Sequence, residues 1–182
     1  MILDATAGNR MMWTNKNPPL TVFLDKEIKL RIPPDVFGCW EKLPFRCDVF
    51  HTIIFDPPHY PTFGPKSIHS NPKGASWFGM YGTKKKLIRA MANALKEFRR
   101  VGKNSCRLCF KWCDTRIEYL EKTTGRWRRR TENPNLWNLL SLFYDWIEVF
   151  RREYTSRYGK NNQTTYWITF IPLHNRNNLK GE

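Results

Sequence analysis

Four short apolar runs in the first third of the chain predict the strands of a parallel sheet. They lie at residues 2–8, 20–25, 34–38 and 49–55, and each runs into a Gly or an Asp. Apolar, β-branched runs suit strands that are covered on both faces. Because all four fit within the first 56 residues, the helices between them must be short. The pattern therefore predicts an α/β sheet with shortened early helices.

The middle of the chain contains a helical and a strand pattern. Residues 84–100 repeat apolar side chains at helical spacing opposite a Lys/Arg face, and Gly102 follows as a stop signal. Residues 106–112 alternate instead, which predicts a strand with Leu108, Phe110 and Trp112 on one face. Between residues 61 and 82, a Pro-, Gly- and Ser-rich stretch predicts a long surface loop of the kind that often covers a ligand.

The last third of the chain predicts an arm, a helix and a final strand. Residues 116–130 alternate around a Thr-Thr-Gly centre, which indicates a hairpin or an arm. An apolar stripe at helical spacing, opened by Asn133 and Pro134, predicts a long helix at about residues 134–157. Residues 165–171 predict the last strand. We expect one domain over residues 1–182, with a basic arm at about 115–133.

Charge is distributed unevenly along the chain. The net charge is +15, and residues 83–182 carry 22 Lys/Arg against 9 Asp/Glu, whereas residues 1–82 carry 9 against 7. A basic half of this strength is typical of nucleic-acid binders, with a generic solvated surface as the alternative. The hydrophobic fraction of 41% excludes a disordered chain.

Several absences in the sequence indicate a location inside the cell. No apolar run approaches the roughly 20 residues that a membrane span needs. The first ten residues lack the basic and apolar regions of a signal peptide. An odd number of cysteines, five, favours reduced thiols and a cytoplasmic location, and we expect no membrane partner.

The densest basic cluster surrounds Trp127. Arginines around an aromatic side chain suit phosphate contact combined with base stacking, although a solvated charge run is the competing interpretation. The candidate nucleic-acid-binding residues are Lys84, Lys85, Arg126, Trp127, Arg128, Arg129 and Arg130.

A zinc site is the weaker interpretation of the cysteines. Cys106 and Cys109 form a C-x-x-C pair, but the strand period puts them on opposite faces. No second ligand pair lies at zinc-finger spacing, so we expect no metal.

Three features at predicted strand ends carry the candidate chemistry. Gly8 lies in a turn of small residues after the first strand, and Asp25 ends the second. A carboxylate at that position can accept hydrogen bonds from ribose hydroxyls, or it can cap the next turn. Asp56 ends the fourth strand, and two prolines then fix its loop. In a parallel sheet all three lie along one edge, where ligands bind.

Together these features resemble the class I S-adenosylmethionine-dependent methyltransferases, and specifically the amino-methyltransferases with an Asp-Pro-Pro-aromatic catalytic motif. Asp4–Gly8 resembles their cofactor loop, and Asp56–His59 resembles their catalytic loop. A closer resemblance is to small phage- and plasmid-type methyltransferase-like proteins. The matching segments are Ile2–Trp13, Asp25, Pro34–Gly38, Leu43–Phe45, Asp56–His59, Phe110–Trp112 and Tyr166–Phe170.

The resemblance implies a Rossmann-like, mostly parallel sheet with an antiparallel last strand, and S-adenosylmethionine as the cofactor. It implies methyl transfer to an exocyclic amine of nucleic acid, with N6 of adenine in DNA favoured. RNA amines, a degenerate nucleic-acid-binding module, and a protein or small-molecule amine remain alternatives. The implied catalytic residues are Asp56, Pro57, Pro58, His59 and Tyr60. The implied cofactor-binding residues are Asp4, Ala5, Thr6, Gly8, Arg10, Asp25, Cys39 and Asp56.

Two departures from the family pattern fall on candidate site residues. Cys39 follows Gly38 where an acid is expected to bond the adenine of the cofactor, so Cys39 or Asp48 must take that role. His59, followed by Tyr60, stands where a plainer aromatic residue is expected to stack on the target base.

Overall fold

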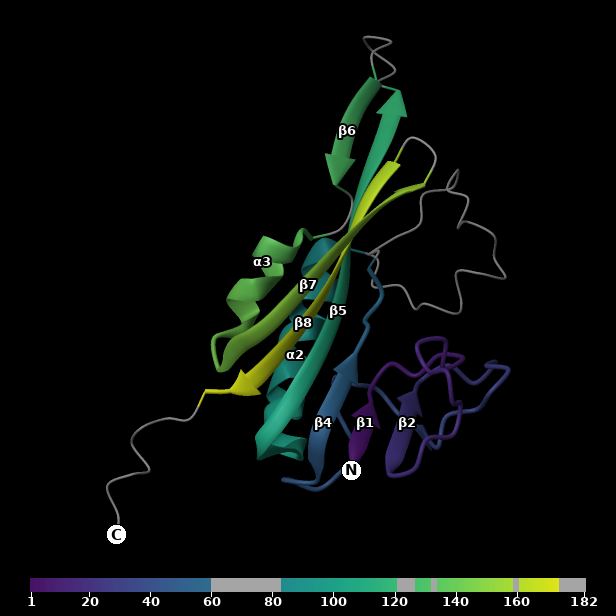
Figure 1. The fold of residues 1–182 in the computed structure, drawn as a ribbon, viewed down its shortest axis with the longest axis vertical. Coiled ribbons are helices and arrows are strands. Elements are labelled where there is room, and N and C mark those ends of the chain that lie inside the picture. Colours follow the sequence, from purple (N-terminus) through teal and green to yellow (C-terminus); the bar gives the residue numbers. More distant parts are fainter. Residues whose placement is uncertain (60–82, 121–126, 132–133, 159–160, 174–182) are drawn as a thin grey trace.

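The computed structural model describes residues 1–59, 83–120, 127–131, 134–158 and 161–173 (Figure 1). These residues form eight strands, two α-helices and a short 3-10 helix. The strands are β1 (Ile2–Asp4), β2 (Thr21–Asp25), β3 (Val36–Phe37), β4 (Phe50–Phe55), β5 (Gly102–Leu120), β6 (Trp127–Thr131), β7 (Trp146–Tyr158) and β8 (Asn161–Pro172). The helices are α2 (Lys84–Val101), α3 (Leu136–Leu140) and η1 (Ser141–Phe143).

The strands form one mixed sheet in the order β3-β2-β1-β4-β5-β8-β7, with β6 paired to β5 outside this path. Pairing is parallel from β3 to β5 and antiparallel at β8 and β7. The predicted fold class is therefore confirmed. The first five strands of this order, β3-β2-β1-β4-β5, follow the order of nucleotide-binding sheets. The strand order therefore reverses between β1 and β4.

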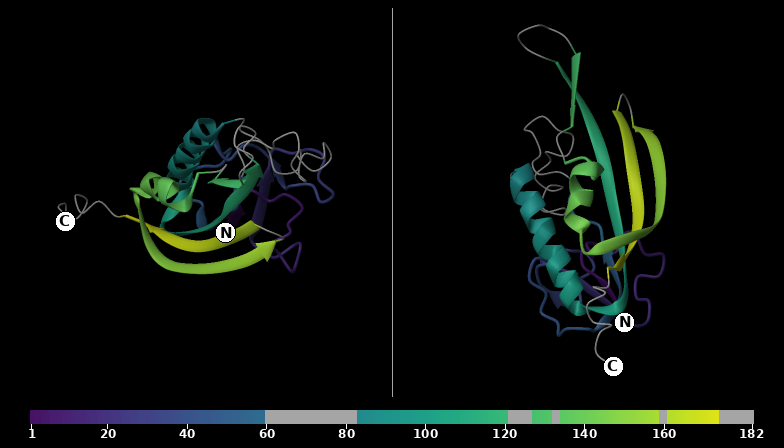
Figure 2. Two further views of the ribbon diagram at one scale, coloured as in Figure 1. Left: turned by 90° about the horizontal axis from the view of Figure 1, so that it is seen from above. Right: turned by 90° about the vertical axis from the view of Figure 1, so that its left-hand side faces the viewer.

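The core lies between the sheet and the helices. Residues Leu108, Phe110 and Trp112 of β5 are fully buried on one face, as the alternation predicted. On that face the ring of Phe110 lies 5.1 Å from the ring of Phe143 in η1, and Phe55 of β4 lies 4.9 Å from Phe98 of α2. Figure 2 shows α2 and α3 on the same side of the strands.

Helix α2 returns the chain from the carboxyl edge of the sheet to the amino edge. Thr83 caps its first turn by accepting a hydrogen bond from the Lys86 N–H. At its other end, the carbonyls of Arg100 and Val101 accept from the N–H groups of Asp48 and Val49, just before β4. The start of α2 therefore lies toward the edge at which β4 ends.

The long helix predicted at about residues 134–157 is wrong. Helical structure covers only 136–143, and from Trp146 the chain is strand β7, paired along β8. Trp146, Ile147 and Phe150 continue the helical spacing of the stripe, but in β7 Trp146 is buried whereas Ile147 and Phe150 are exposed. Aromatic and β-branched residues are frequent between 146 and 158, and they favour the extended form.

Part of the predicted basic arm forms an antiparallel strand pair. The outer end of β5, Arg116–Leu120, pairs antiparallel with β6 (Figure 1). Trp127, Arg128, Arg129 and Arg130 lie on β6, whereas Arg126 and the predicted loop at 61–82 lie outside the described residues.

Candidate active site at the carboxyl ends of β1, β2 and β4

The loop that follows β1 is held between its two neighbouring strands. Its backbone N–H groups at Ala5 and Ala7 donate to the carbonyls of Ile54 in β4 and Leu24 in β2, at 3.0 and 3.1 Å. Gly8 adopts a φ of +49°, and its N–H donates to Asp25 Oδ2 at 2.8 Å. The structure thus joins the Gly8 turn and Asp25, which the sequence placed at one sheet edge.

Asp4 is buried inside this loop. Its Oδ1 accepts from the Thr6 N–H at 3.1 Å and its Oδ2 accepts from Trp13 Nε1 at 2.7 Å. Burial raises the pKa of Asp4 to about 6, and the nearby Asp56 and Asp25 carboxylates add to that shift. Asp4 is fully buried and both of its oxygens bond within the protein, so it orders the loop; a role for Asp4 in cofactor binding stays a prediction.

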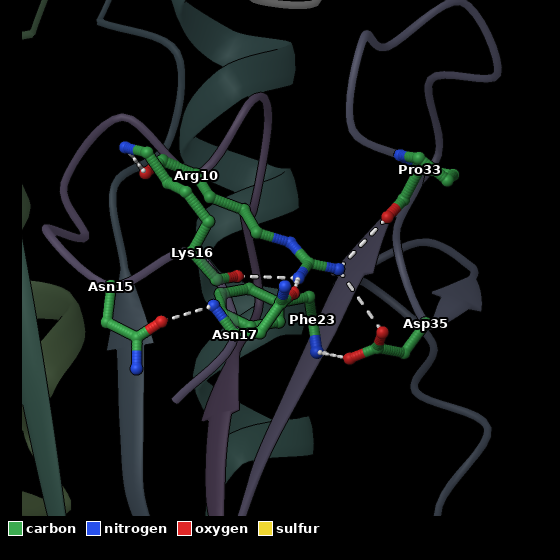
Figure 3. A network of polar contacts seen from close by, with 7 residues as sticks. All are labelled: Arg10, Asn15, Lys16, Asn17, Phe23, Pro33 and Asp35. Atoms are coloured by element: carbon green, nitrogen blue, oxygen red, sulfur yellow. Dashed lines mark hydrogen bonds and ion pairs between the residues drawn. The ribbon is translucent and has the colours of Figure 1, made fainter. Parts of the chain in front are cut away.

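Arg10 has a structural role in the loops around β2. Its guanidinium is buried over the ring of Phe23, 3.8 Å from the centroid. Figure 3 shows the network around it, in which Arg10 donates to the Lys16 and Pro33 carbonyls, to Asn17 Oδ1 and to Asp35 Oδ1. Arg10 therefore fixes the loops on either side of β2, and its role in cofactor binding stays a prediction.

Asp25 keeps hydrogen-bonding capacity toward the solvent side. Each of its oxygens accepts one backbone N–H, from Gly8 at 2.8 Å and from Glu27 at 2.9 Å, and the residue is half-buried. Because a carboxylate oxygen has two lone pairs, both oxygens can accept a second hydrogen bond.

Cys39 and Asp48 are the two candidates to replace the acid expected to bind the adenine, and the structure places them at opposite edges of the sheet. Cys39 follows β3 at the same sheet edge as Asp25, and it is half-buried. Asp48 precedes β4, and its N–H donates to the carbonyl of Arg100 at the opposite edge. Asp48 is therefore excluded from this site.

Asp56 is fixed by contacts from three directions. Its N–H donates to Thr6 Oγ1 at 2.8 Å, which ties the end of β4 to the loop after β1. Its Oδ2 lies 2.6 Å from Lys111 Nζ of β5. His59 Nε2 lies 3.3 Å from its Oδ1, but without hydrogen-bond geometry. Asp56 Oδ1 is thus a buried acceptor with no hydrogen-bond partner among the described residues.

His59 packs edge-on against Trp112, with ring centroids 5.2 Å apart. Burial lowers the pKa of His59 to about 4; the Asp56 carboxylate opposes that shift and Lys111 adds to it. The imidazole is therefore neutral near pH 7. Its Nδ1 has no hydrogen-bond partner among the described residues. Pro57 is buried and Pro58 half-buried beside it, and Tyr60 lies outside the described residues.

Sequence reasoning missed Lys111 as a site residue. It lies 55 positions from Asp56, and only the pairing of β4 with β5 brings the two together. The alternation of residues 106–112 did place Lys111 on the face away from the core, which was the one available signal.

The predicted nucleic-acid-binding residues lie at two places. Lys84 and Lys85 are exposed in the first turn of α2, which contains no acidic residue. Cations at a helix amino terminus oppose the helix dipole, so this arrangement is not explained by helix stability. The arm residues 127–130 lie in β6, away from the strand ends of the parallel half.

Two further findings concern the described residues alone. They contain no group of three His, Cys, Asp or Glu side chains positioned to hold a metal ion. None of their helices is long and apolar enough to span a membrane.

Comparison with known proteins supports the fold. No protein-family model and no curated protein matches the sequence. An S-adenosylmethionine-dependent methyltransferase of Methanosarcina mazei has a similar structure, with a TM-score of 0.52 at 12% identity, over 95% of this chain and 92% of that protein. A protein of Pyrococcus horikoshii gives a TM-score of 0.51 at 13% identity, over 94% and 81%. The chain therefore has the Rossmann-like fold of class I methyltransferases.

Proposed function

We propose that the protein is an S-adenosylmethionine-dependent methyltransferase that modifies an exocyclic amine of nucleic acid, with N6 of adenine in DNA as the target. The observation that carries this proposal is the state of Asp56. One carboxylate oxygen is held by Lys111, and the other is a buried acceptor with no hydrogen-bond partner among the described residues, so it has capacity for an N–H of a substrate.

The residues around the loop after β1 fit the cofactor. A side chain at Gly8 would meet nothing within 4 Å, so the space over the loop is open. Asp25 beside it has free lone pairs for two ribose hydroxyls. Asp4, Asp25 and Asp56 are close enough for their charges to interact, which favours a ligand with a cationic sulfonium. Cys39 lies at the same edge, where we place the adenine.

When bound, S-adenosylmethionine supplies a methyl group whose bond to sulfur breaks as the bond to the amine nitrogen forms. Asp56 Oδ1 and the main-chain carbonyl of Pro57 accept the two amine hydrogens. This draws the nitrogen toward tetrahedral geometry, so its lone pair is released from the ring for in-line attack. The electron pair of the broken bond stays on sulfur, and the methylated nitrogen loses one proton to Asp56 or to water. Fixed positioning of the acceptors supplies much of the rate.

Lys111 and His59 support this arrangement. Lys111 holds Oδ2 of Asp56 through a charge-assisted contact of 2.6 Å, which leaves Oδ1 as the acceptor for the substrate. His59 is neutral and held by Trp112, and an uncharged ring is suited to stacking on a base. The target base must be unpaired or flipped out of a duplex to reach it.

The charge distribution supports nucleic acid as the substrate. The second half of the chain carries most of the +15 net charge, and Lys84 and Lys85 at the start of α2 lie toward the edge that holds Asp56. A protein or small-molecule amine would not need this excess of charge.

Two measurements test the proposal. Calorimetry with S-adenosylmethionine should show binding that weakens about tenfold or more in Asp25→Ala, whereas Glu27→Ala, the neighbouring acid, serves as the matched control. Tritiated methyl transfer onto duplex DNA, single-stranded DNA and total RNA should then show incorporation into DNA. Absence of cofactor binding, or equal binding in Asp25→Ala, would contradict the enzyme assignment; incorporation into RNA alone would reassign the substrate.

A further inference from the structure

The face of β5, β8 and β7 that is turned away from α2 and α3 carries exposed rings. Phe150 is 57% exposed, Tyr154 67% and Trp167 39%. The cross-strand register places them on one face, because Phe150 pairs with Thr169, Tyr154 with Thr165 and Trp167 with Arg152. The neighbouring residues Ile168 and Phe170 are buried on the opposite, helix-covered face. Figure 2 shows both described helices on that opposite side.

Cations lie between these rings. Arg152 pairs with Trp167 across β7 and β8, and Lys111 pairs with Trp167 across β5 and β8. Lys111 Nζ lies 5.5 Å from the centroid of the Trp167 ring. Arg107 is exposed on the same face of β5, and no described carboxylate pairs with it or with Arg152. We call the surface formed by Phe150, Arg152, Tyr154, Trp167 and Arg107 the open face.

The open face is continuous with the candidate catalytic carboxylate. Asp56, Lys111, Trp167 and Arg152 form one cross-strand row, because Asp56 contacts Lys111 at 2.6 Å and the next two residues follow by register. Neighbouring strands lie roughly 5 Å apart, so the row extends about 15 Å from Asp56 to β7. A ligand held along this row therefore extends to Lys111, which contacts the Asp56 carboxylate.

We infer, building on the proposed function, that the open face binds an unpaired stretch of the nucleic acid strand and leads its target base to Asp56. Each of the three rings can stack on one base, and the cations beside them can contact the phosphates. Rings interleaved with cations on a sheet are suited to a polyanion with flat bases.

Stacking of bases on exposed rings also favours an unpaired strand over a duplex. Bases in a duplex stack on one another and present only their edges in the grooves, so the flat faces that a sheet-borne ring contacts are hidden. A strand that is already unpaired also avoids part of the cost of flipping the target base.

The test measures strand binding by fluorescence anisotropy, without cofactor. The probes are a short labelled DNA strand of mixed sequence, the RNA of the same sequence, and the DNA duplex. The intact chain should bind the single strands more tightly than the duplex. Each of Phe150→Ala, Tyr154→Ala and Trp167→Ala should weaken binding roughly fivefold or more, and the triple variant roughly a hundredfold.

The matched control removes two equally exposed rings elsewhere. Trp137→Ala with Tyr144→Ala, at residues that are 65% and 68% exposed in α3 and just after η1, should change binding by about twofold at most. If the triple variant folds poorly, Arg152→Gln replaces it, and that variant should lower the salt dependence of log affinity by about one unit.

Three results would overturn the inference. The first is wild-type affinity in the triple variant or an unchanged salt slope in Arg152→Gln. The second is tighter binding of the duplex than of the single strands. The third is a shift from dimer to monomer in the triple variant with unchanged strand affinity, which would assign the open face to a second copy of the chain. Since no cofactor is present, failure of methyl transfer would leave these results unaffected.

Discussion

The parallel and antiparallel halves of the sheet are stabilised in different ways. In the parallel half, β1 to β4 are two to six residues long, and buried side chains bond to loop backbones, as Asp4 and Arg10 do. In the antiparallel half, β7 and β8 are 13 and 12 residues long and are joined by a long backbone ladder with one register shift, between Glu148 and Phe150.

The two halves are therefore suited to different tasks: the parallel half to positioning catalytic groups and the antiparallel half to recognition. Short strands leave the geometry of their loops to specific polar contacts, so the parallel half holds carboxylates in fixed positions. Long strands are stabilised by their ladder, so side chains on their outer face are free for recognition. Asp56, directly after β4, and Lys111 of β5 lie where the halves meet. Four variants or conditions test this division.

Asp56→Ala should give the largest effect. Removing the amine acceptor should lower kcat by about a thousandfold, because the lone pair of the amine stays delocalised. Single-turnover methyl transfer measures this change, with strand binding to the open face retained. Glu153→Ala, an exposed acid on β7, is the control and should keep full activity. Substantial residual turnover in Asp56→Ala would refute the assigned role.

Arg10→Met should be the most destabilising change in the parallel half. It removes the guanidinium contacts that join the loops around β2, at a cost of about 2–4 kcal/mol in the free energy of unfolding. Urea unfolding measures the loss, and Lys29→Met at an exposed site is the control. Unchanged stability in Arg10→Met would show that the loops are held by other contacts.

Stability between pH 6.5 and pH 4 depends on two opposing groups. The pKa of His59 is lowered from 6.5 to about 4, so as pH falls through this window the unfolded state binds the proton first and stability is lost. The pKa of Asp4 is raised from 3.8 to about 6, so below pH 6 the native state binds the proton first and stability is gained. Each effect is at most about 3 kcal/mol.

His59→Gln and Asp4→Asn separate these two slopes. Relative to the wild type, His59→Gln should gain stability as pH falls from 6.5 to 4, and Asp4→Asn should lose it. Chemical denaturation at several pH values in this window measures both. Parallel stability curves for the wild type and the two variants would rule out these proton linkages.

Lys111→Met should have a smaller effect on the reaction than Asp56→Ala. Loss of the contact that orients Asp56 should lower kcat about tenfold, with a smaller change in KM, because Lys111 acts as a positioning residue. Lys111→Arg should restore part of the rate, and Lys96→Met on the exposed side of α2 should have no effect. A change in KM alone would instead indicate direct contact with the strand.

The strand ends of the parallel half could be predicted from the sequence. Asp25 and Asp56 end apolar runs, and in a parallel sheet such ends meet at one edge regardless of the residues between them. The contacts made there could not be predicted. Arg10 matched a cofactor motif, yet its partners Pro33 and Asp35 lie 23 and 25 positions away, so only the folded loop shows its role.

The antiparallel half was harder to predict. Leu136, Leu139 and Phe143 indicated a helix correctly, but apolar residues at helical spacing continue into β7, which is a strand. The helix predicted for residues 146–158 does not place Phe150, Arg152 and Tyr154 on one face, whereas the alternation of strand β7 does. Pairing with β8 determines that residues 146–158 form a strand. This long-range pairing cannot be predicted from the residues of the segment alone.

The most direct test of the central claim identifies the methylated atom. The wild-type protein is incubated with S-adenosylmethionine carrying a deuterated methyl group and with single-stranded DNA, and the nucleosides are analysed by mass spectrometry after digestion. The account predicts the label on N6 of adenine, and its absence with Asp56→Ala. Label on a ring nitrogen or a carbon atom, or no labelled nucleoside although the cofactor binds, would contradict it.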